Sequence, residues 1–263
     1  MLADHHLLKK APRVGAFFVL LIGISPASAA NCSPPVTTEP VQVRYVHDGD
    51  SLVLADNTKI RLIGINTPEI AHQDQPTQAL AIKARDRLRQ LLFQQGHRAR
   101  LIYGEQRQDR HSRNLAHLWL ADGSNLSAEL LREGLAWAVA IPPNVRYLDC
   151  YLEAEATARA ASRGVWGHPD HMPRESSDLS LRDEGFQRVR GRIIRVNHGG
   201  GATWINLQGR FAVRIPDQDI GWFKNRPARS WIGREIEVAG WLYSVKGELR
   251  VNIQHPAGLQ FID

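Results

Sequence analysis

Three short polar clusters in the first half of this 263-residue sequence carry side chains that can do chemistry. The first is the turn Asp48-Gly49-Asp50-Ser51, in which two carboxylates stand two residues apart at a bend. Divalent cations bind hard oxygen ligands of this kind. Asp and Gly are also ordinary turn residues, so the turn alone does not separate a metal site from a plain bend.

The second cluster is the string RLIGINTPE, which runs from Arg61 to Glu69. Arg61 carries a planar guanidinium whose geometry suits two phosphate oxygens at once. Asn66 offers an amide oxygen, and the Thr67 carbonyl has a fixed direction because a residue before proline is held extended. Glu69 lies on the loop after the strand and can act as a general base. An amphipathic strand ending in a proline turn explains the same residues without any chemistry.

The third cluster is the polar loop DRHSRN at positions 109–114, directly ahead of an apolar strand. Taken alone, it fits a solvated hairpin loop. Together, the three clusters place an oxygen-rich turn and two arginine-bearing segments in order within one region of the chain. Cations and guanidiniums that meet at one point stabilise the charge that develops on a phosphate under attack.

The elements that must position these clusters follow from the periodicity of the apolar residues. Strands are predicted at 41–46, 51–54, 59–65, 99–103 and 115–120, and helices from Gln75-Pro76 onward, at 127–132 and at 147–162. Strands first and helices after predict an α+β, mostly β domain: a small β-barrel with packed helices.

A second strand-rich region follows a stretch at 168–185 that has the Pro and Ser content of a linker. The predicted strands are 189–196, 203–207, 211–215, 235–243 and 249–253, with a short helix near 217–224. Five short strands with one helix in that position predict a second small OB-like barrel at 186–263. The periodicity alone also allows another small barrel or a sandwich. Its aromatic residues suit single-strand binding, but tryptophans at strand positions more often fill a core.

Composition narrows the class of protein. Hydrophobic residues make up 43% and charged residues 23%, which excludes a mostly disordered chain, and only one stretch is strongly apolar, which excludes a multi-span membrane protein. Two cysteines are too few for a tetrathiolate zinc site. Residues 186–263 hold twelve Lys/Arg against six Asp/Glu, so they carry the excess positive charge that favours polyanionic partners.

The N-terminus reads as a secretory signal at 1–29, with basic residues, an eleven-residue apolar run and small residues before the expected cleavage after Ala29. Eleven apolar residues fall short of a membrane span, and Asn31 before Cys32 disfavours a lipoprotein. Export to a periplasm or the medium would let Cys32 and Cys150 pair, although two free thiols remain the alternative. We expect a monomer without membrane attachment after cleavage.

The three clusters together resemble the staphylococcal nuclease (thermonuclease) family over roughly 41–166. RLIGINTPE is the most specific string, and DGDS, DRHSR, REGLA at 132–136 and RGVW at 163–166 fall where the family has them. The resemblance implies an OB-fold nuclease domain, placed at 38–167. It also implies calcium-dependent cleavage of DNA and RNA phosphodiesters on the 5′-oxygen side, which leaves 3′-phosphates.

By the same resemblance, Asp50, Asn66 and the Thr67 carbonyl look like Ca²⁺ ligands, with Asp48 supporting their turn. Most members of the family carry Asp where this chain has Asn66, and the lost charge predicts weaker calcium binding.

The resemblance further implies that Arg61 and Arg113 bind the scissile phosphate and that Glu69 activates or positions the attacking water. The remaining candidates, from the third cluster, are Asp109 as a support and Arg110 and His111 as substrate contacts. His111 stands where the family can have a stacking tyrosine.

Two other functions fit parts of the sequence. One is a catalytically weak nucleic-acid-binding or envelope-interaction protein on a nuclease scaffold whose metal site has decayed at Asn66. The other is a structural adaptor made of two barrels. Retention of Arg61, Glu69 and Arg113 argues against both, because a binder needs no general base.

Overall fold

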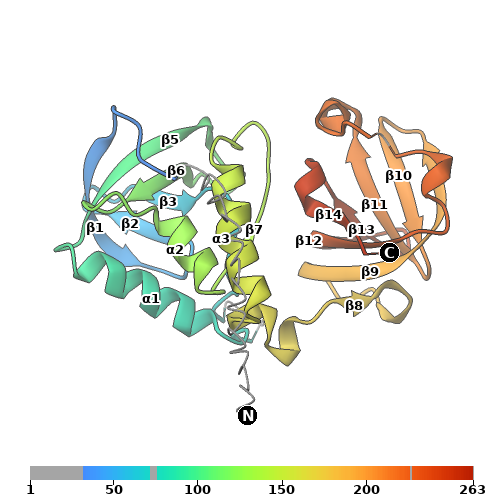
Figure 1. The fold of residues 1–263 in the computed structure, drawn as a ribbon, viewed down its shortest axis with the longest axis horizontal. Helices are drawn as coiled ribbons and strands as arrows, with labels where there is room; N and C mark the ends of the chain where they lie inside the picture. The colour runs from blue at the N-terminus through green and yellow to red at the C-terminus, as the bar shows by residue number, and fades with distance from the viewer. Residues whose placement is uncertain (1–31, 72–75, 226, 263) are drawn as a thin grey trace, which may run out of the picture.

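Two β-barrels with the same strand connectivity make up the chain (Figure 1). The structure is a computed structural model that describes residues 32–71, 76–225 and 227–262. The predicted signal segment at 1–29 lies outside the described residues. Within those residues, no helix is long and apolar enough to cross a membrane.

The first barrel closes in the order β1-β2-β3-β6-β5. Its strands are β1 Glu39–Val46, β2 Ser51–Leu54, β3 Lys59–Leu62, β5 Arg98–Gln108 and β6 Asn114–Trp119. Only the β3–β6 pair is parallel; the four other pairs are antiparallel. Alternate residues point inward from these strands, and the fully buried Leu52, Ile60 and Leu101 lie at the centre of the core.

The predicted strand at 59–65 is wrong in one respect, because the chain turns after Leu62 and resumes as β4 Ile65–Asn66. Gly64 makes this turn with a φ of +82°. A Cβ at this position would lie 2.3 Å from the ring of Tyr151, so only glycine fits. The turn sends β4 out of the barrel, where it pairs with β7 Trp137–Ala138.

Three α-helices pack on this barrel: α1 Ala81–Phe93, α2 Leu126–Arg132 and α3 Leu148–Ala160. The side chain of Asn125 caps α2 by accepting a hydrogen bond from the Ala128 N–H at 3.1 Å. The prediction that Gln75-Pro76 opens α1 is wrong, since the helix begins at Ala81. Residues 76–80 instead fold back on the loop around Glu69, where Gln78 and Thr77 bind its backbone.

A disulfide joins Cys32, at the start of the described chain, to Cys150 in α3, with the two Cα atoms 5.5 Å apart. The indole N–H of Trp119 donates to the carbonyl of Cys32 at 2.7 Å, which adds a second link to the barrel. The N-terminal segment is thereby attached both to a helix and to β6.

The second barrel repeats the strand order of the first, as β9-β10-β11-β13-β12 with β12 closing on β9. Its strands are β9 Gly185–His198, β10 Ala202–Leu207, β11 Phe211–Pro216, β12 Glu235–Val245 and β13 Glu248–Asn252. The β11–β13 pair is parallel, like β3–β6 in the first barrel. The chain is therefore mostly β with two small five-stranded barrels, as the sequence predicts.

Shorter elements flank this barrel. Strand β8 Arg174–Glu175 pairs with β9 and β14 Leu259–Phe261 pairs with β12. The 3₁₀ helices are η1 Gly164–Trp166, η2 Pro169–His171, η3 Ser176–Asp178, η4 Asp217–Trp222, η5 Arg229–Trp231 and η6 Pro256–Gly258. The segment 168–185, which reads as a linker, thus contributes β8 to the second sheet. The helix near 217–224 is the 3₁₀ helix η4.

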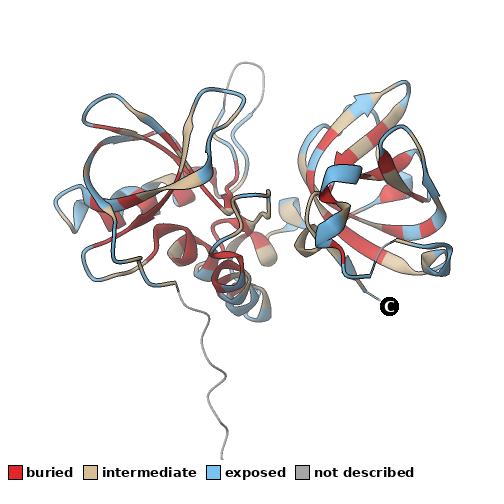
Figure 2. Cartoon of the chain, turned by 90° about the horizontal axis from the view of Figure 1, so that it is seen from above, coloured by how far each residue is buried: buried red, intermediate tan, exposed pale blue. Residues whose placement is uncertain are grey.

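Contacts between the barrels join α3, β7 and η1 to β9 and β12, and α3 and β7 lie on the side of the first barrel that faces the second (Figure 1). Trp166 lies between two guanidiniums, with its ring centroid 5.0 Å from Arg159 and 4.5 Å from Arg188. Arg188, which is buried, donates two hydrogen bonds to Glu237 at 2.9 and 2.6 Å. Buried positions gather along the inward faces of both barrels and continue into this contact (Figure 2).

Candidate active site

The barrel strands bring the first two polar clusters together. Residue Ser51 at the start of β2 pairs with Arg61 of β3, and the Asp50 carbonyl accepts a hydrogen bond from the Leu62 N–H at 2.8 Å. The Asp48 carboxylate accepts from the Asp50 N–H at 3.0 Å, which fixes the turn. The turn therefore delivers both carboxylates to the end of β3, where the RLIGINTPE string begins.

Asp50 and Arg61 form the centre of the site. Their Oδ2 and Nη2 atoms lie 2.9 Å apart, and both side chains are largely buried. The same Nη2 lies 3.2 Å from Oδ1 of Asn66, and the Thr67 N–H donates to Asp50 at 3.0 Å. Arg61 also donates to the carbonyls of Leu62 and Ile65, which holds its guanidinium in place. One guanidinium nitrogen thus bridges two of the three expected calcium ligands.

Arg113 joins the same cluster from the third polar loop. Its Nε lies 2.8 Å from Oδ2 of Asp109, whose Oδ1 accepts from the backbone N–H groups of His111 and Arg113. Its Nη1 donates to Oγ of Ser51 at 3.0 Å, and this hydroxyl donates to Oδ1 of Asp50 at 3.0 Å. A continuous chain of contacts therefore runs from Asp109 through Arg113 and Ser51 to Asp50.

Glu69 lies at the solvent side of this cluster on the loop after β4. Its backbone is held by Gln78, which accepts from the Glu69 N–H through its side chain and donates to the Glu69 carbonyl, both at 2.9 Å. Desolvation raises the pKa of the Glu69 carboxyl and the charge of Asp50 raises it further, while Arg61 and Arg113 lower it. All three charged side chains are thus close enough to influence Glu69.

Burial raises the pKa of Asp48 to about 7, and the nearby charge of Asp50 adds to the effect. Arg61 already pairs with Asp50, so a cation bound at this turn would share that carboxylate with the guanidinium. The Thr67 hydroxyl is also buried, and in the described chain it has no hydrogen-bond partner. Carboxylate, amide and carbonyl oxygens are the donors that Ca²⁺ prefers, so the residues present fit this ion.

Among the described residues, no three His, Cys, Asp or Glu side chains group as a metal site. The expected ligand set of Asp50, Asn66 and the Thr67 carbonyl contains only one such side chain. The other two ligands would be an amide oxygen and a backbone carbonyl.

Arg110 and His111 are not part of this chain of contacts. Both side chains are exposed, and Nε of Arg110 donates to Nε2 of His111 at 3.0 Å. Their proposed contact with substrate stays a prediction.

Two residues near the site, Gln78 and Trp137, are not evident from the sequence, and Ser51 stands in the first cluster without an expected role. Ser51 connects Arg113 to Asp50, and Gln78 holds the Glu69 loop. Trp137 pairs with Asn66 through the β4–β7 ladder, and its ring packs on Phe186 of the second barrel at 5.0 Å. The DGDS string contains Ser51, but the roles of Gln78 and Trp137 arise from contacts with distant segments.

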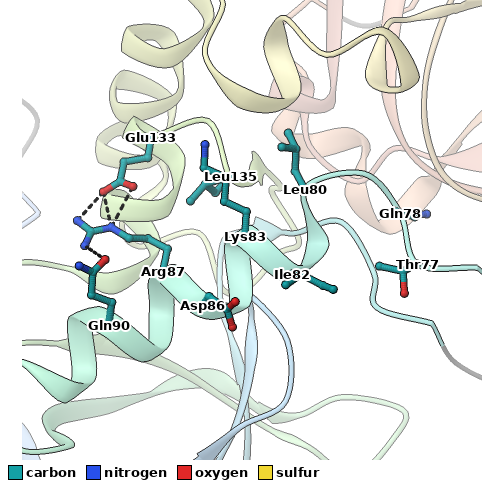
Figure 3. Close-up of a pocket in the computed structure, with 10 residues that line it drawn as sticks. All are labelled: Thr77, Gln78, Leu80, Ile82, Lys83, Asp86, Arg87, Gln90, Glu133 and Leu135. Atoms are coloured by element: carbon teal, nitrogen blue, oxygen red, sulfur yellow. Dashed lines mark hydrogen bonds and ion pairs between the residues drawn. The ribbon is translucent and has the colours of Figure 1, made fainter.

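A groove with a cavity volume of about 810 Å³ lies beside α1 (Figure 3). Arg87 forms an ion pair with Glu133 at 2.6 Å and donates to Gln90 at 3.0 Å, so its guanidinium is already bound. Gln78 lines both this groove and the Glu69 loop. The groove therefore adjoins the candidate site but does not contain its charged residues.

Comparison with known proteins identifies the family of the first barrel. The staphylococcal nuclease homologue family matches residues 59–168. A thermonuclease from Staphylococcus intermedius is 32% identical over 137 residues, which cover 51% of this chain and 80% of the relative. A thermonuclease from Staphylococcus hyicus is 32% identical over 130 residues, or 48% and 75% of the two chains.

A third relative, endonuclease YhcR of Bacillus subtilis, is 27% identical over 203 residues, which cover 71% of this chain but only 17% of the relative. The matched family segment contains both arginine-bearing clusters and Glu69. This chain belongs to the staphylococcal nuclease homologue family.

Proposed function

We propose that the protein is a calcium-dependent nuclease that hydrolyses DNA and RNA phosphodiester bonds at the 5′-oxygen and leaves 3′-phosphates. Its class, a phosphodiesterase, follows from membership of the family. The observation that supports the rest is the run of contacts that joins Arg113, Ser51, Asp50 and Arg61, with Glu69 beside it. Two guanidiniums thus flank one buried carboxylate at a surface that Glu69 also reaches.

This arrangement suits attack of water on a phosphodiester. The planar forks of Arg61 and Arg113 would bind the non-bridging phosphate oxygens, on which negative charge grows during attack. Glu69 would accept a proton from the incoming water. Its raised pKa suits that role, because a general base works best when its pKa lies near the working pH.

Asp50, Asn66 and the Thr67 carbonyl would hold the calcium ion, with Asp48 supporting the turn. When bound, the ion supplies positive charge that stabilises the phosphate oxygens as they become more negative. Arg61 would then share Asp50 with the ion, since its guanidinium bridges Asp50 and Asn66 in this structure.

The Asn66→Asp variant should bind calcium more tightly than the natural chain, because it restores a carboxylate to the ligand set. Calcium titrations of the two proteins, read by isothermal calorimetry, measure this directly. Equal half-saturation in both proteins would contradict the assignment of Asn66 as a ligand.

We further propose that the chain is exported, by the signal at 1–29, to a periplasm or the medium, where it acts as a monomer. The pairing of Cys32 with Cys150 supports this proposal, because disulfides persist in oxidising compartments. Detection of the processed chain outside the cytoplasm, with its N-terminus at Ala30, is the test.

The main experiment is digestion of plasmid DNA and of RNA with calcium, with EGTA and with a Glu69→Gln variant. We expect cleavage only with calcium, a large loss in the variant, and products whose ends are 3′-phosphates. Binding of nucleic acid without cleavage under every condition would favour the alternative, a catalytically weak binding protein on the same scaffold.

A further inference from the structure

The outward face of β10, β11 and β13 in the second barrel carries aromatic and basic side chains in place of the usual mixed polar surface. Residues that alternate with them, such as Ile205 and Val213, point into the core and are fully buried. Trp204 and Arg214 are only partly buried and lie on the outer side. Because successive side chains of a strand point to opposite faces, one defined set of side chains is presented to solvent.

The strand register brings this set together. Trp204 of β10 is opposite Arg214 of β11, and Tyr243 of β12 is opposite Arg250 of β13. Arg195, an exposed residue of β9, completes the face. We call Trp204, Tyr243, Arg195, Arg214 and Arg250 the β10–β13 platform.

Contacts within the platform are those of an aromatic ring surrounded by positive charge. The guanidinium of Arg250 lies 4.8 Å from the centre of the Trp204 ring, and that of Arg214 lies 5.9 Å away. The Trp204 N–H donates to the Gly199 carbonyl at 2.9 Å, which fixes the indole. Arg250 also pairs with Glu248 at 2.8 Å. Three guanidiniums outnumber the Glu248 carboxylate and the buried Asp219, which interacts with Arg214, so the face is positively charged.

The arginines on the side of the barrel that faces the first domain bind protein groups instead. Arg188 and Arg190 both bind Glu237, at 2.6 and 2.9 Å, and Arg188 packs against Trp166 of the first barrel. Arg188 joins the two domains, and Arg190, which is partly exposed, pairs with the same carboxylate. The excess positive charge of 186–263 that faces solvent on β10–β13 is therefore available to a partner.

We propose that the β10–β13 platform binds single-stranded nucleic acid. Bases stack on aromatic rings and on guanidinium planes, and arginines also bind the phosphates between them. The outer faces of the second and third strands, here β10 and β11, are where five-stranded barrels of this type bind oligonucleotides. The proposal rests on the proposed nuclease function, because the bound strand would be the substrate of the first barrel.

The test measures binding of the full chain in EGTA, by anisotropy, to a labelled oligothymidine and to a duplex of the same length. The double variant Arg214→Gln/Arg250→Gln should bind the single strand more weakly, with a salt slope lower by about 1.4, since each phosphate contact on a single strand contributes about 0.7. The matched control is Arg192→Gln, an exposed arginine of the same domain that is paired with Glu235.

Trp204→Ala should weaken binding of the single strand by about 5- to 100-fold if one base stacks on the indole. Trp204→Phe keeps a stacking ring and should recover most of the affinity. Thermal melting of each variant separates loss of binding from loss of folding. If Trp204→Ala fails to fold, the double arginine variant still tests the platform.

Unchanged affinity in the folded arginine variant, or equal losses in Arg192→Gln, would overturn the proposal. If the natural chain binds the duplex as tightly as the single strand, and neither Trp204→Phe nor Trp204→Ala changes the affinity for the single strand, stacking of bases on Trp204 is overturned. Cleavage of a dinucleotide, which is too short to reach both domains, tests the nuclease site separately. If platform variants lose strand binding while no protein cleaves plasmid DNA, RNA or the dinucleotide, the nuclease function is refuted and the platform stands.

Discussion

The two barrels share one strand order and differ in what their surfaces carry. The first is covered by three α-helices and draws its site from loops at the ends of strands. The second has only 3₁₀ helices among its described residues, so its strands are open to solvent on the side of β10–β13. The same topology therefore hosts a candidate catalytic site in one copy and a candidate binding surface in the other. Function is set by the side chains placed on a fold rather than by the fold itself.

Buried charge shows the difference most clearly. Asp50 and Asp48 of the first barrel are 2% and 7% exposed and belong to the proposed calcium site. Arg188 and Glu237 of the second barrel are 7% and 6% exposed, but they pair with each other at the contact between domains. Arg188 and Glu237 neutralise each other, whereas Asp48 and Asp50 share one turn in which Arg61 pairs with Asp50. Burial of charge alone thus does not identify a site.

The largest effect is expected from Arg113→Ala. Loss of one guanidinium aimed at the reacting phosphate should lower the cleavage rate by about 10²- to 10³-fold. Single-strand binding in EGTA should change little, because the platform lies in the other barrel. The control is Arg107→Ala. It removes an arginine of β5 whose guanidinium lies 4.6 Å from the ring centroid of Tyr103 in the same strand. Steady-state cleavage assays on the two variants check the comparison.

Removal of the disulfide should act on the first barrel alone. The double variant Cys32→Ser/Cys150→Ser opens a link between residues 118 positions apart. Loss of such a bridge typically lowers the free energy of unfolding by about 2–5 kcal/mol. Urea unfolding, read by tryptophan fluorescence, should show the first barrel destabilised while the second keeps its midpoint. Equal shifts in both barrels would mean that the domains unfold as one unit.

A smaller effect is expected from pH at the contact between the barrels. Glu155 of α3 accepts a hydrogen bond from the Ala138 N–H at 2.6 Å, and burial raises the pKa of its carboxyl to about 7. The folded state therefore binds a proton more tightly than the unfolded chain does, whose carboxyl has the ordinary value of 4.5. Stability should fall as the pH rises from about 4.5 to about 7 and change no further from this group above that.

Thermal midpoints of the natural chain and of Glu155→Gln, measured across this range, test the effect. The variant cannot ionise at this position, so its midpoint should lose this part of the pH dependence. Parallel curves for the two proteins would show that Glu155 does not titrate in this window.

Much of the fold could be predicted from local pattern. Alternation of apolar residues predicts the strands of both barrels, and the RLIGINTPE string predicts the family. The start of α1 could not be predicted, because Gln78 is recruited by the distant Glu69 backbone rather than by its own helix. The three-residue strand β14 is too short to show a period.

The aromatic residues of the second barrel illustrate the same limit. The expectation that most of them fill the core is wrong: Phe211 and Phe223 are buried, but Trp204, Trp231 and Tyr243 are only partly buried. Trp222 and Trp241 are 43% and 39% exposed. A strand pattern gives the face on which a residue lies, but the partners of that face depend on register and on the neighbouring domain. Trp241, for example, packs on Phe186, which contacts Trp137 of the first barrel.

The central claim is that Arg61 and Arg113 act on one phosphate, and a double-mutant cycle on cleavage tests it most directly. Arg61→Lys, Arg113→Lys and the double variant are compared for kcat/KM on the same oligonucleotide. When two groups act as a unit, replacing either one already removes most of the rate enhancement that the pair provides. The kcat/KM of the double variant should therefore fall far less than the product of the two single losses. Losses that multiply fully would show that the two guanidiniums act independently and would contradict the account.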